Sequence, residues 1–274
     1  MKFLFIFIAV FVSMNSRQQI KNYDLEKFDQ QLVLHKSLNE ISALALNNNQ
    51  RLFALQDEAG KIYELDIISG NILKIFTLGR TTINADFEGL AIVGESFFAV
   101  TSSGILYEFN EGKNNESVIY QTYHLGFDSK FDIEGLCYDR KNNSLLIAPK
   151  EYAGENYEEH RAIYSFDLGQ KKINPKPKFL ISLNQLKDKF NIKDFFPSAI
   201  EYNELTGSYF ILSSKGKSCL VEIDIEGNVT SAAEFDKKNH RQPEGIAFLN
   251  SGTMLISDEA SGKSPTLTFY LYHE

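Results

Sequence analysis

The sequence predicts an all-β fold, a β-propeller of five blades with four strands in each blade. The first reason is a phrase that recurs along the chain, a strand-like run that follows Glu-Gly or a similar pair. It reads EISALAL, DFEGLAI, DIEGLCY, FPSAIEY and QPEGIAF, and it places Ser42, Glu88, Glu134, Ser198 and Glu244 at one equivalent position. Successive copies are 46, 46, 64 and 46 residues apart. Periods of this size are typical of propellers.

The second reason is the strand content of each repeat. The first unit contains four short apolar runs, ISALAL, RLFALQD, KIYELDI and NILKIFTL, separated by turn residues such as Ser69-Gly70. Four strands in about 45 residues form one propeller blade. In the second unit the fourth strand is expected in VIYQTYHL. The third unit is 18 residues longer than the others, too few for another blade. We expect a polar loop at EYAGENYEEH and either a short helix or an extended loop around Leu183 to Phe190.

The ends of the chain are expected to meet. The segment QQLVLHK, residues 30–36, is strand-like, and the last unit ends with LTFYLY. A propeller that does not join its ends leaves an open sheet edge, so we expect the N-terminal strand to complete the last blade. The alternative is a six-bladed wheel in which both ends form a degenerate sixth blade. No linker interrupts residues 22–274, which predicts one propeller domain.

The N-terminus has the layout of a secretory signal peptide. Lys2 precedes an apolar run from Phe3 to Met14, and small polar residues follow. The run of 12 residues is shorter than the roughly 20 that span a bilayer. We therefore expect a signal peptide over residues 1–16 and export to the periplasm, the cell envelope or the medium. The alternative is an uncleaved leader, the one expected route to membrane association.

Composition narrows the classes of partner. The 274 residues carry a net charge of -8, and no Lys/Arg-rich run interrupts the acidic balance, which argues against a nucleic-acid partner. Cys137 and Cys219 lie in strand-like runs and are expected to be buried free thiols. The absence of a CxxC motif or a Cys/His cluster argues against zinc.

The repeated position predicts a ring of side chains around the central channel, because the first strand of each blade lines that channel. Glu88, Glu134 and Glu244 would converge there, and the following glycines would let the backbones approach one another. Three carboxylates that meet in a narrow channel either stay partly protonated or bind a cation. Calcium prefers six to eight oxygen ligands, and Ser42 and Ser198 add oxygen to the same ring.

A second ring is expected at the mouth of the channel, where the second strand of each blade ends. Its pairs are Asp57-Glu58, Ser102-Ser103, Lys150-Glu151, Ser214-Lys215 and Asp258-Glu259. Lys150 and Lys215 could instead form ion pairs with the acids and leave no metal. Asp86 and Asp132, two residues before the ring, could add ligands or could cap turns. His240 and Arg241 are also expected near the mouth.

These segments together resemble the SdiA-regulated family of bacterial propellers. The resemblance rests on NYDLEKFDQQLVLHKSLNEISALAL, RLFALQDEAGKIYELDIISG, DFEGLAIV with TSSGILYEF, FPSAIEYNELTGSYFILSS, and QPEGIAF with ISDE, and it extends over about residues 22–270. It implies an exported or envelope-associated propeller with calcium in the channel, held by Glu88, Glu134 and Glu244 and, further out, by Asp57, Asp258 and Glu259. Two departures are Ala43, where many relatives have glycine, and the serines at positions 42 and 198.

Two classes of function remain open. One is a non-enzymatic, calcium-stabilised module that binds a protein, a glycan or a small molecule, or that serves as a scaffold for assembly. The other is a calcium-dependent hydrolase of lactones or phosphoesters. Such an enzyme needs a general base or a substrate clamp. Only His240 among the five histidines is expected near the channel, and the GxSxG, HExxH and P-loop motifs are missing. The sequence therefore favours the binding module.

Overall fold

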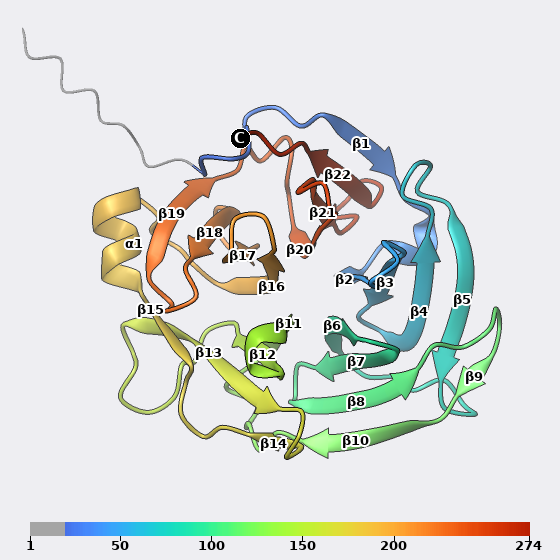
Figure 1. Ribbon diagram of the computed structural model, residues 1–274. Coiled ribbons are helices and arrows are strands. Elements are labelled where there is room, and N and C mark those ends of the chain that lie inside the picture. The colour runs from blue at the N-terminus through green and yellow to red at the C-terminus, as the bar shows by residue number, and fades with distance from the viewer. Residues whose placement is uncertain (1–19) are drawn as a thin grey trace, which may run out of the picture.

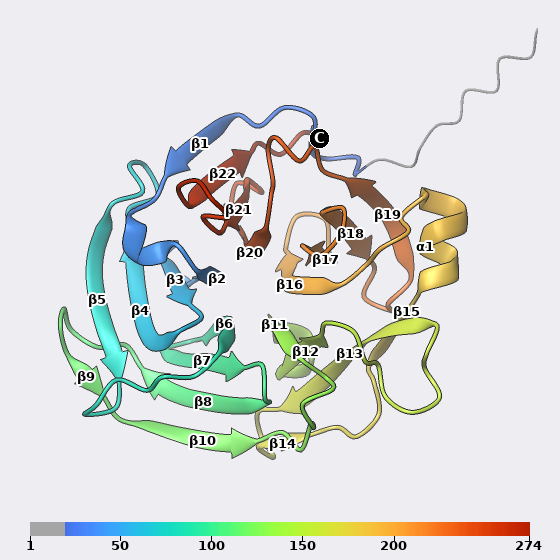
Figure 2. The same cartoon turned by 180° about the vertical axis from the view of Figure 1, so that it is seen from behind.

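Five β-sheets surround a central channel in the computed structural model, which describes residues 20–274 (Figure 1). Each sheet runs from an inner strand at the channel to an outer strand at the rim, and the view from behind shows the same radial order (Figure 2). The predicted five-bladed propeller is confirmed. The predicted signal peptide, residues 1–16, lies outside the described residues.

The blades follow the repeat in chain order. Blade one contains β2 (Ile41–Leu46), β3 (Leu52–Gln56), β4 (Ala59–Leu65) and β5 (Ile72–Leu78). Blade two contains β6 (Phe87–Val93), β7 (Ser96–Thr101), β8 (Ile105–Asn110) and β10 (Tyr120–His124). Blade three contains β11 (Ile133–Asp139), β12 (Ser144–Pro149), β13 (His160–Asp167), β14 (Lys172–Ile173) and β15 (Phe179–Ser182). Blade four contains β16 (Pro197–Asn203), β17 (Ser208–Ser213), β18 (Cys219–Ile223) and β19 (Val229–Glu234). Blade five contains β20 (Pro243–Phe248), β21 (Met254–Asp258), β22 (Thr266–Tyr270) and β1 (Gln30–Val33).

The N-terminal strand closes the wheel, as predicted. β1 pairs antiparallel with β22, from Gln30 opposite Phe269 to Val33 opposite Thr266. The hydrogen bonds from Asp29 N to Phe269 O and from Leu34 N to Pro265 O extend this pairing by one residue at each end. Because β1 covers the edge of β22, the two ends of the chain share one sheet. The six-bladed alternative is therefore wrong.

The fourth strand of the second unit differs from the prediction. The segment VIYQTYHL is divided between β9 (Ser117–Val118) and β10. β9 pairs in parallel with β5 of blade one, with Thr77 opposite Ser117, whereas β10 pairs antiparallel with β8. The linking Ile119 is 89% exposed. The free backbone groups along the edge of β5 attract this crossing segment, because an unpaired strand edge accepts any neighbouring strand.

The longer third unit enlarges the outside of blade three. β14 and β15 both pair with β13, and Pro175 and Pro177 lie between them. Proline has no N–H to donate to a ladder, so the outer strand is broken there. Of the two alternatives for the next segment, the helix is correct, since α1 spans Leu183–Phe190. Ser182 caps its N-terminus by accepting a hydrogen bond from Gln185 N.

The core lies between neighbouring blades. Aromatic side chains meet edge to face across the junctions, as Phe53 and Phe97 do with ring centroids 4.9 Å apart. Cys137 and Cys219 are buried free thiols, as predicted. Within residues 20–274, no helix is long and apolar enough to span a membrane.

Candidate metal site at one end of the channel

Each of the five repeated residues occupies a β-bulge at the start of an inner strand. The register against the second strand shifts at the pairs Ile41/Ala43, Phe87/Gly89, Ile133/Gly135, Pro197/Ala199 and Pro243/Gly245. The residue passed over in each shift is Ser42, Glu88, Glu134, Ser198 or Glu244. A bulge leaves one residue out of the ladder and re-aims its side chain. The backbone therefore has the same bulge at all five ring positions.

The glycines after the glutamates allow the blades to meet, as the sequence suggested. A Cβ atom placed on Gly89 would lie 2.7 Å from Leu136 Cβ and 2.9 Å from Val100 Cγ1. Both distances are below ordinary van der Waals contact. Gly135 and Gly245 are similarly confined by the next blade around the wheel, at Ile200 and Leu44. A side chain at these positions would push neighbouring blades apart.

Four of the five ring side chains are buried and Glu88 is partly exposed, and some ring oxygens have no partner among the described residues. Ser42, Glu134, Ser198 and Glu244 are each at most 5% exposed. Glu134 Oε1 lies 2.5 Å from Lys150 Nζ, and Ser198 Oγ donates to Pro243 O at 2.8 Å. In contrast, Ser42 Oγ and Glu244 Oε2 are buried without a hydrogen-bond partner in the described part of the chain. A buried oxygen without a partner costs free energy, so these two atoms are suited to a ligand.

Burial raises the pKa values of all three glutamates, and repulsion from other ring carboxylates raises those of Glu88 and Glu134 further. For Glu88, burial and then the charges of Glu134 and Asp86 hold the pKa well above its ordinary value. Burial and Glu244 likewise raise the pKa of Glu134, although Lys150 acts against them. Burial raises the pKa of Glu244, again against the effect of Lys150. One lysine therefore faces three carboxyl groups, and at neutral pH the excess charge is removed by protons or by a cation.

The residues of the predicted second ring lie at the mouth of the channel, where the second strand of each blade ends beside the start of the first. The backbone N–H groups of Asp57, Ser102, Lys150 and Glu259 donate to the carbonyls of Glu40, Asp86, Asp132 and Gln242. The mouth is also acidic. Burial, then Glu40 and Asp86, raise the pKa of Asp57 to about 6. Burial, then Glu244, raise the pKa of Glu259 to about 8. Asp57 Oδ1 is a third buried oxygen that has no partner in the part of the chain that the structure describes.

Asp258 has a different environment from the other predicted ligands. His240 Nδ1 lies 2.6 Å from its Oδ2, and its Oδ1 accepts the N–H groups of Arg241 and Gln242. His240 is fully buried, and its Nε2 lies 2.8 Å from the Tyr270 hydroxyl. Both oxygens of Asp258 thus hold the loop that leads into β20.

The other residues expected at the mouth are less closely engaged with the ring. Lys215 is exposed, forms an ion pair with Glu151, and lies 4.8 Å from the Phe196 ring centroid. The Arg241 side chain is also exposed. Asp86 is exposed and Asp132 half-buried, and Asp132 has a left-handed backbone with φ of 50°. Of the predicted cations, Lys150 alone contacts a ring glutamate within residues 20–274.

Below the ring the channel is closed by apolar side chains. Two residues after each ring position stand branched aliphatic residues, namely Leu44, Leu90, Leu136, Ile200 and Ile246. They line, with Ser42, Glu88 and Glu134, a space of only about 10 Å³. That is near the minimum for one water molecule. Little space therefore remains below the ring in the described part of the chain.

The residues present fit a hard cation. All the candidate donors are oxygens, the ligand type that calcium prefers, and three of these oxygens are buried without a partner. In residues 20–274, no three His, Cys, Asp or Glu side chains already form a preassembled metal-ligand group. The sequence did not predict Ser257, whose buried Oγ also lacks a partner within residues 20–274. The available sequence signal was its position directly before Asp258, in the segment ISDE, and the structure pairs Ser257 with Gly245 on the adjacent strand.

Comparisons with known proteins agree with this architecture. The structure is similar to Myxococcus xanthus glutaminyl cyclase, with a TM-score of 0.59 and 12% identity over 90% of this chain and 97% of that one. It is also similar to the PQQ-bound aldose sugar dehydrogenase from Streptomyces coelicolor, with a TM-score of 0.56 and 10% identity over 90% and 98% of the two chains. At such low identity these likenesses show the fold alone. No curated protein sequence matches the chain.

One family model covers almost the whole chain. The match extends over residues 17–270 and therefore includes the five bulged ring positions and every blade. It agrees with the resemblance that the repeated segments carry. The chain belongs to the SdiA-regulated family of β-propeller proteins.

Proposed function

We propose that this protein is an exported, calcium-binding β-propeller that acts as a non-enzymatic binding or scaffold module. The observation that carries the proposal is a pair of buried oxygens, Ser42 Oγ and Glu244 Oε2, which have no partner among the described residues, in a ring that also holds Glu88 and Glu134. Among residues 20–274, Lys150 is the one cation paired with a ring carboxylate. A divalent cation would neutralise the ring and satisfy these oxygens.

Glu88, Glu134 and Glu244 would hold the ion, with oxygens from Ser42 and Ser198. Asp57 and Glu259, whose pKa values are raised at the mouth, would form an outer set. The inner ligands come from all five blades, so calcium would tie the wheel together at its axis. Asp258 would act indirectly, because its contacts with His240, Arg241 and Gln242 fix the loop before Glu244.

The contacts of His240 support the non-enzymatic interpretation. A general base needs a free lone pair within reach of substrate, whereas both ring nitrogens of His240 have buried partners, Asp258 and Tyr270. The space of about 10 Å³ below the ring leaves no room for a substrate on that side of the ring. Export is proposed from the leader-like residues 1–16.

Thermal unfolding of the purified chain tests the calcium proposal. Samples in chelator are compared with samples to which calcium is returned, because a ligand that binds only the folded state raises the melting temperature. The variants are Glu88→Gln/Glu134→Gln and a matched control, Glu95→Gln/Glu226→Gln, which removes two exposed glutamates.

We expect calcium to raise the melting temperature of the wild type and the control, and to leave the ring variant unchanged. An equal response of all three proteins, or none in the wild type, would refute the proposal. Hydrolysis of lactone or phosphoester probes by the calcium-loaded wild type, lost in the ring variant, would favour the hydrolase instead.

A further inference from the structure

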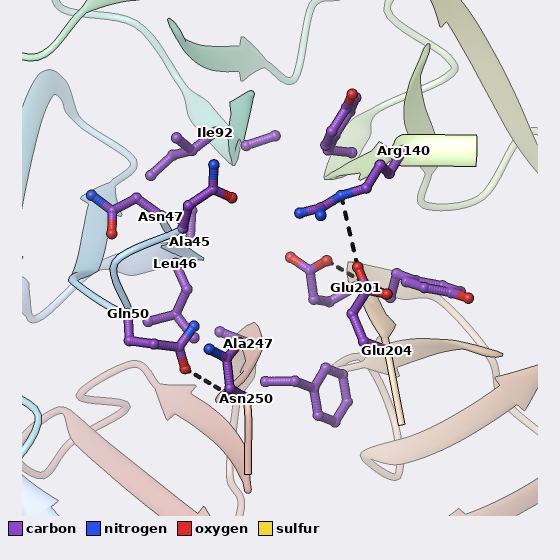
Figure 3. A pocket seen from close by; sticks show the side chains of 15 residues that line it. Ala45, Leu46, Asn47, Gln50, Ile92, Arg140, Glu201, Glu204, Ala247 and Asn250 are labelled. Carbon is purple, nitrogen blue, oxygen red and sulfur yellow. Dashed lines mark hydrogen bonds and ion pairs between the residues drawn. The ribbon is translucent and has the colours of Figure 1, made fainter. Parts of the chain in front are cut away.

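A second cavity lies at the opposite end of the channel from the glutamate ring. Figure 3 shows the side chains that line it. The ring stands at the beginning of the inner strands, whereas this cavity is lined by their ends, such as Leu46 of β2 and Phe248 of β20. Its volume is about 470 Å³. Pockets that bind small molecules have volumes of about 300–1,000 Å³.

The repeat identifies one unusual residue in this cavity. Three residues after the ring position, blades one, two, three and five carry Ala45, Ala91, Cys137 and Ala247. Blade four carries Glu201 at the same place. Glu201 and the three alanines line the cavity together. A single acidic side chain thus replaces a small one on an otherwise apolar floor, and Figure 3 shows it extending into the pocket.

The carboxyl group of Glu201 has no positively charged partner in the described residues. Glu201 Oε1 accepts the Tyr202 N–H at 2.8 Å and the Cys137 thiol at 3.4 Å, and both donors are neutral. None of the ion pairs formed within residues 20–274 includes Glu201. Burial raises its pKa to about 7. The remaining oxygen can accept a hydrogen bond from a ligand.

The walls and the rim suit an organic ligand. Tyr138, Tyr202 and Phe248 are half-buried and line the sides. At the rim, Arg140 Nε lies 3.8 Å from Glu204 Oε1, and both side chains are 67% exposed. These two charges offset each other, which leaves Glu201 as the uncompensated charge of the pocket. Aromatic faces beside a carboxylate favour a cation.

We propose that this cavity binds a small organic cation, a primary amine with an apolar body. Its ammonium group donates to Glu201 on the floor, and its body lies against Tyr138, Tyr202 and Phe248. The side-chain amides of Asn47 and Asn250, which also line the cavity, form hydrogen bonds with polar substituents of the ligand. This site shares no residue with the proposed calcium ring, so either proposal can fail while the other stands.

Calorimetric titration of the full chain with benzylamine tests the site, and benzyl alcohol serves as a neutral probe of the same size. Glu201→Gln keeps an acceptor for Tyr202 and Cys137 but removes the charge. Glu201→Ala installs the residue that blades one, two and five already carry. Glu226→Gln removes an exposed turn glutamate as the matched control.

At pH 8 we expect benzylamine to bind the wild type and the control equally, and to bind both Glu201 variants at least about tenfold more weakly. Benzyl alcohol should bind all four proteins equally weakly. Equal benzylamine affinity in the Glu201 variants would overturn the proposal, as would benzyl alcohol binding as tightly as benzylamine. Failure of the wild type to bind at about 10 mM benzylamine would also overturn it.

Discussion

Lys150 Nζ lies 2.5 Å from Glu134 Oε1, so a lysine at the end of β12 supplies the internal cation of the glutamate ring. Burial alone would lower the pKa of Lys150, but Glu134 outweighs that effect and the pKa is raised. The ammonium group thus occupies part of the space that a metal would use. At the proposed site, calcium and Lys150 would compete for the same carboxylate.

We predict that Lys150→Met destabilises the protein in chelator and strengthens calcium binding. The loss of the cation leaves Glu134 buried without a partner, which should lower the free energy of unfolding by roughly 1–3 kcal/mol, limited because Glu134 can take up a proton. Calcium should then bind about tenfold more tightly, since one competing charge is gone. Chemical denaturation and calcium calorimetry measure the two effects.

Lys215→Met is the matched control for this substitution. Lys215 is also near the mouth, but it pairs with Glu151 on the exposed surface. Exposed ion pairs contribute little, so we expect a change within about 0.5 kcal/mol and no effect on calcium. Similar behaviour of the two lysine variants would contradict a special role for Lys150.

A second prediction concerns pH. Glu88 has a raised pKa in the folded state, first because it is buried and then because Glu134 and Asp86 are near. Below the ordinary glutamate pKa both states are protonated and the group has no effect on stability. Above it, the unfolded chain releases the proton while the folded chain keeps it, so stability falls as pH rises.

In chelator, the free energy of unfolding should therefore fall between about pH 5 and 8, by at most about 1.4 kcal/mol per pH unit for each retained proton. Glu88→Gln should flatten this dependence, because glutamine does not titrate. Urea unfolding at a series of pH values measures the slope. A slope unchanged by the substitution would show that Glu88 is already ionised in the folded protein.

Glycine substitutions test how closely the blades approach. Gly89→Ala places a methyl group 2.7 Å from Leu136 Cβ, which forces blades two and three apart. We expect a loss of roughly 1–3 kcal/mol. The reverse change at the equivalent position, Ala43→Gly, should cost only about 0.5–1 kcal/mol through backbone entropy. Equal losses measured by urea unfolding would mean that contact at the axis does not limit the fold.

The repeat predicted the architecture because the spacing of its copies indicates the blades, whichever side chains fill each blade. The spacings of Ser42, Glu88, Glu134, Ser198 and Glu244 favoured five blades over six, and the strand-like residues 30–36 predicted the closure that β1 makes. The split of the second unit at Ile119 could not be predicted in this way. It depends on the unpaired edge of β5, which exists only once blade one has formed.

The site was predicted in outline by the same repeat. The alignment of the repeats on their glutamates predicted the ring. Three residues further along each repeat, Glu201 stands where the other blades carry alanine or cysteine. The burial of His240 was not predictable. Its partner Tyr270 lies 30 residues further along the chain, in β22, and reaches His240 through the folding of blade five.

The last prediction separates the structural role of Asp258 from a ligand role. Asp258→Asn weakens the contacts with His240, Arg241 and Gln242, and we expect it to lower the free energy of unfolding by roughly 2–4 kcal/mol. Because the oxygens of Asp258 already have partners, the rise in melting temperature caused by calcium should persist. Tyr270→Phe, which removes the other partner of His240, should cost about 1–2 kcal/mol and also leave calcium binding intact. If Asp258→Asn instead abolishes the calcium response while the protein in chelator keeps its stability, Asp258 binds the metal directly.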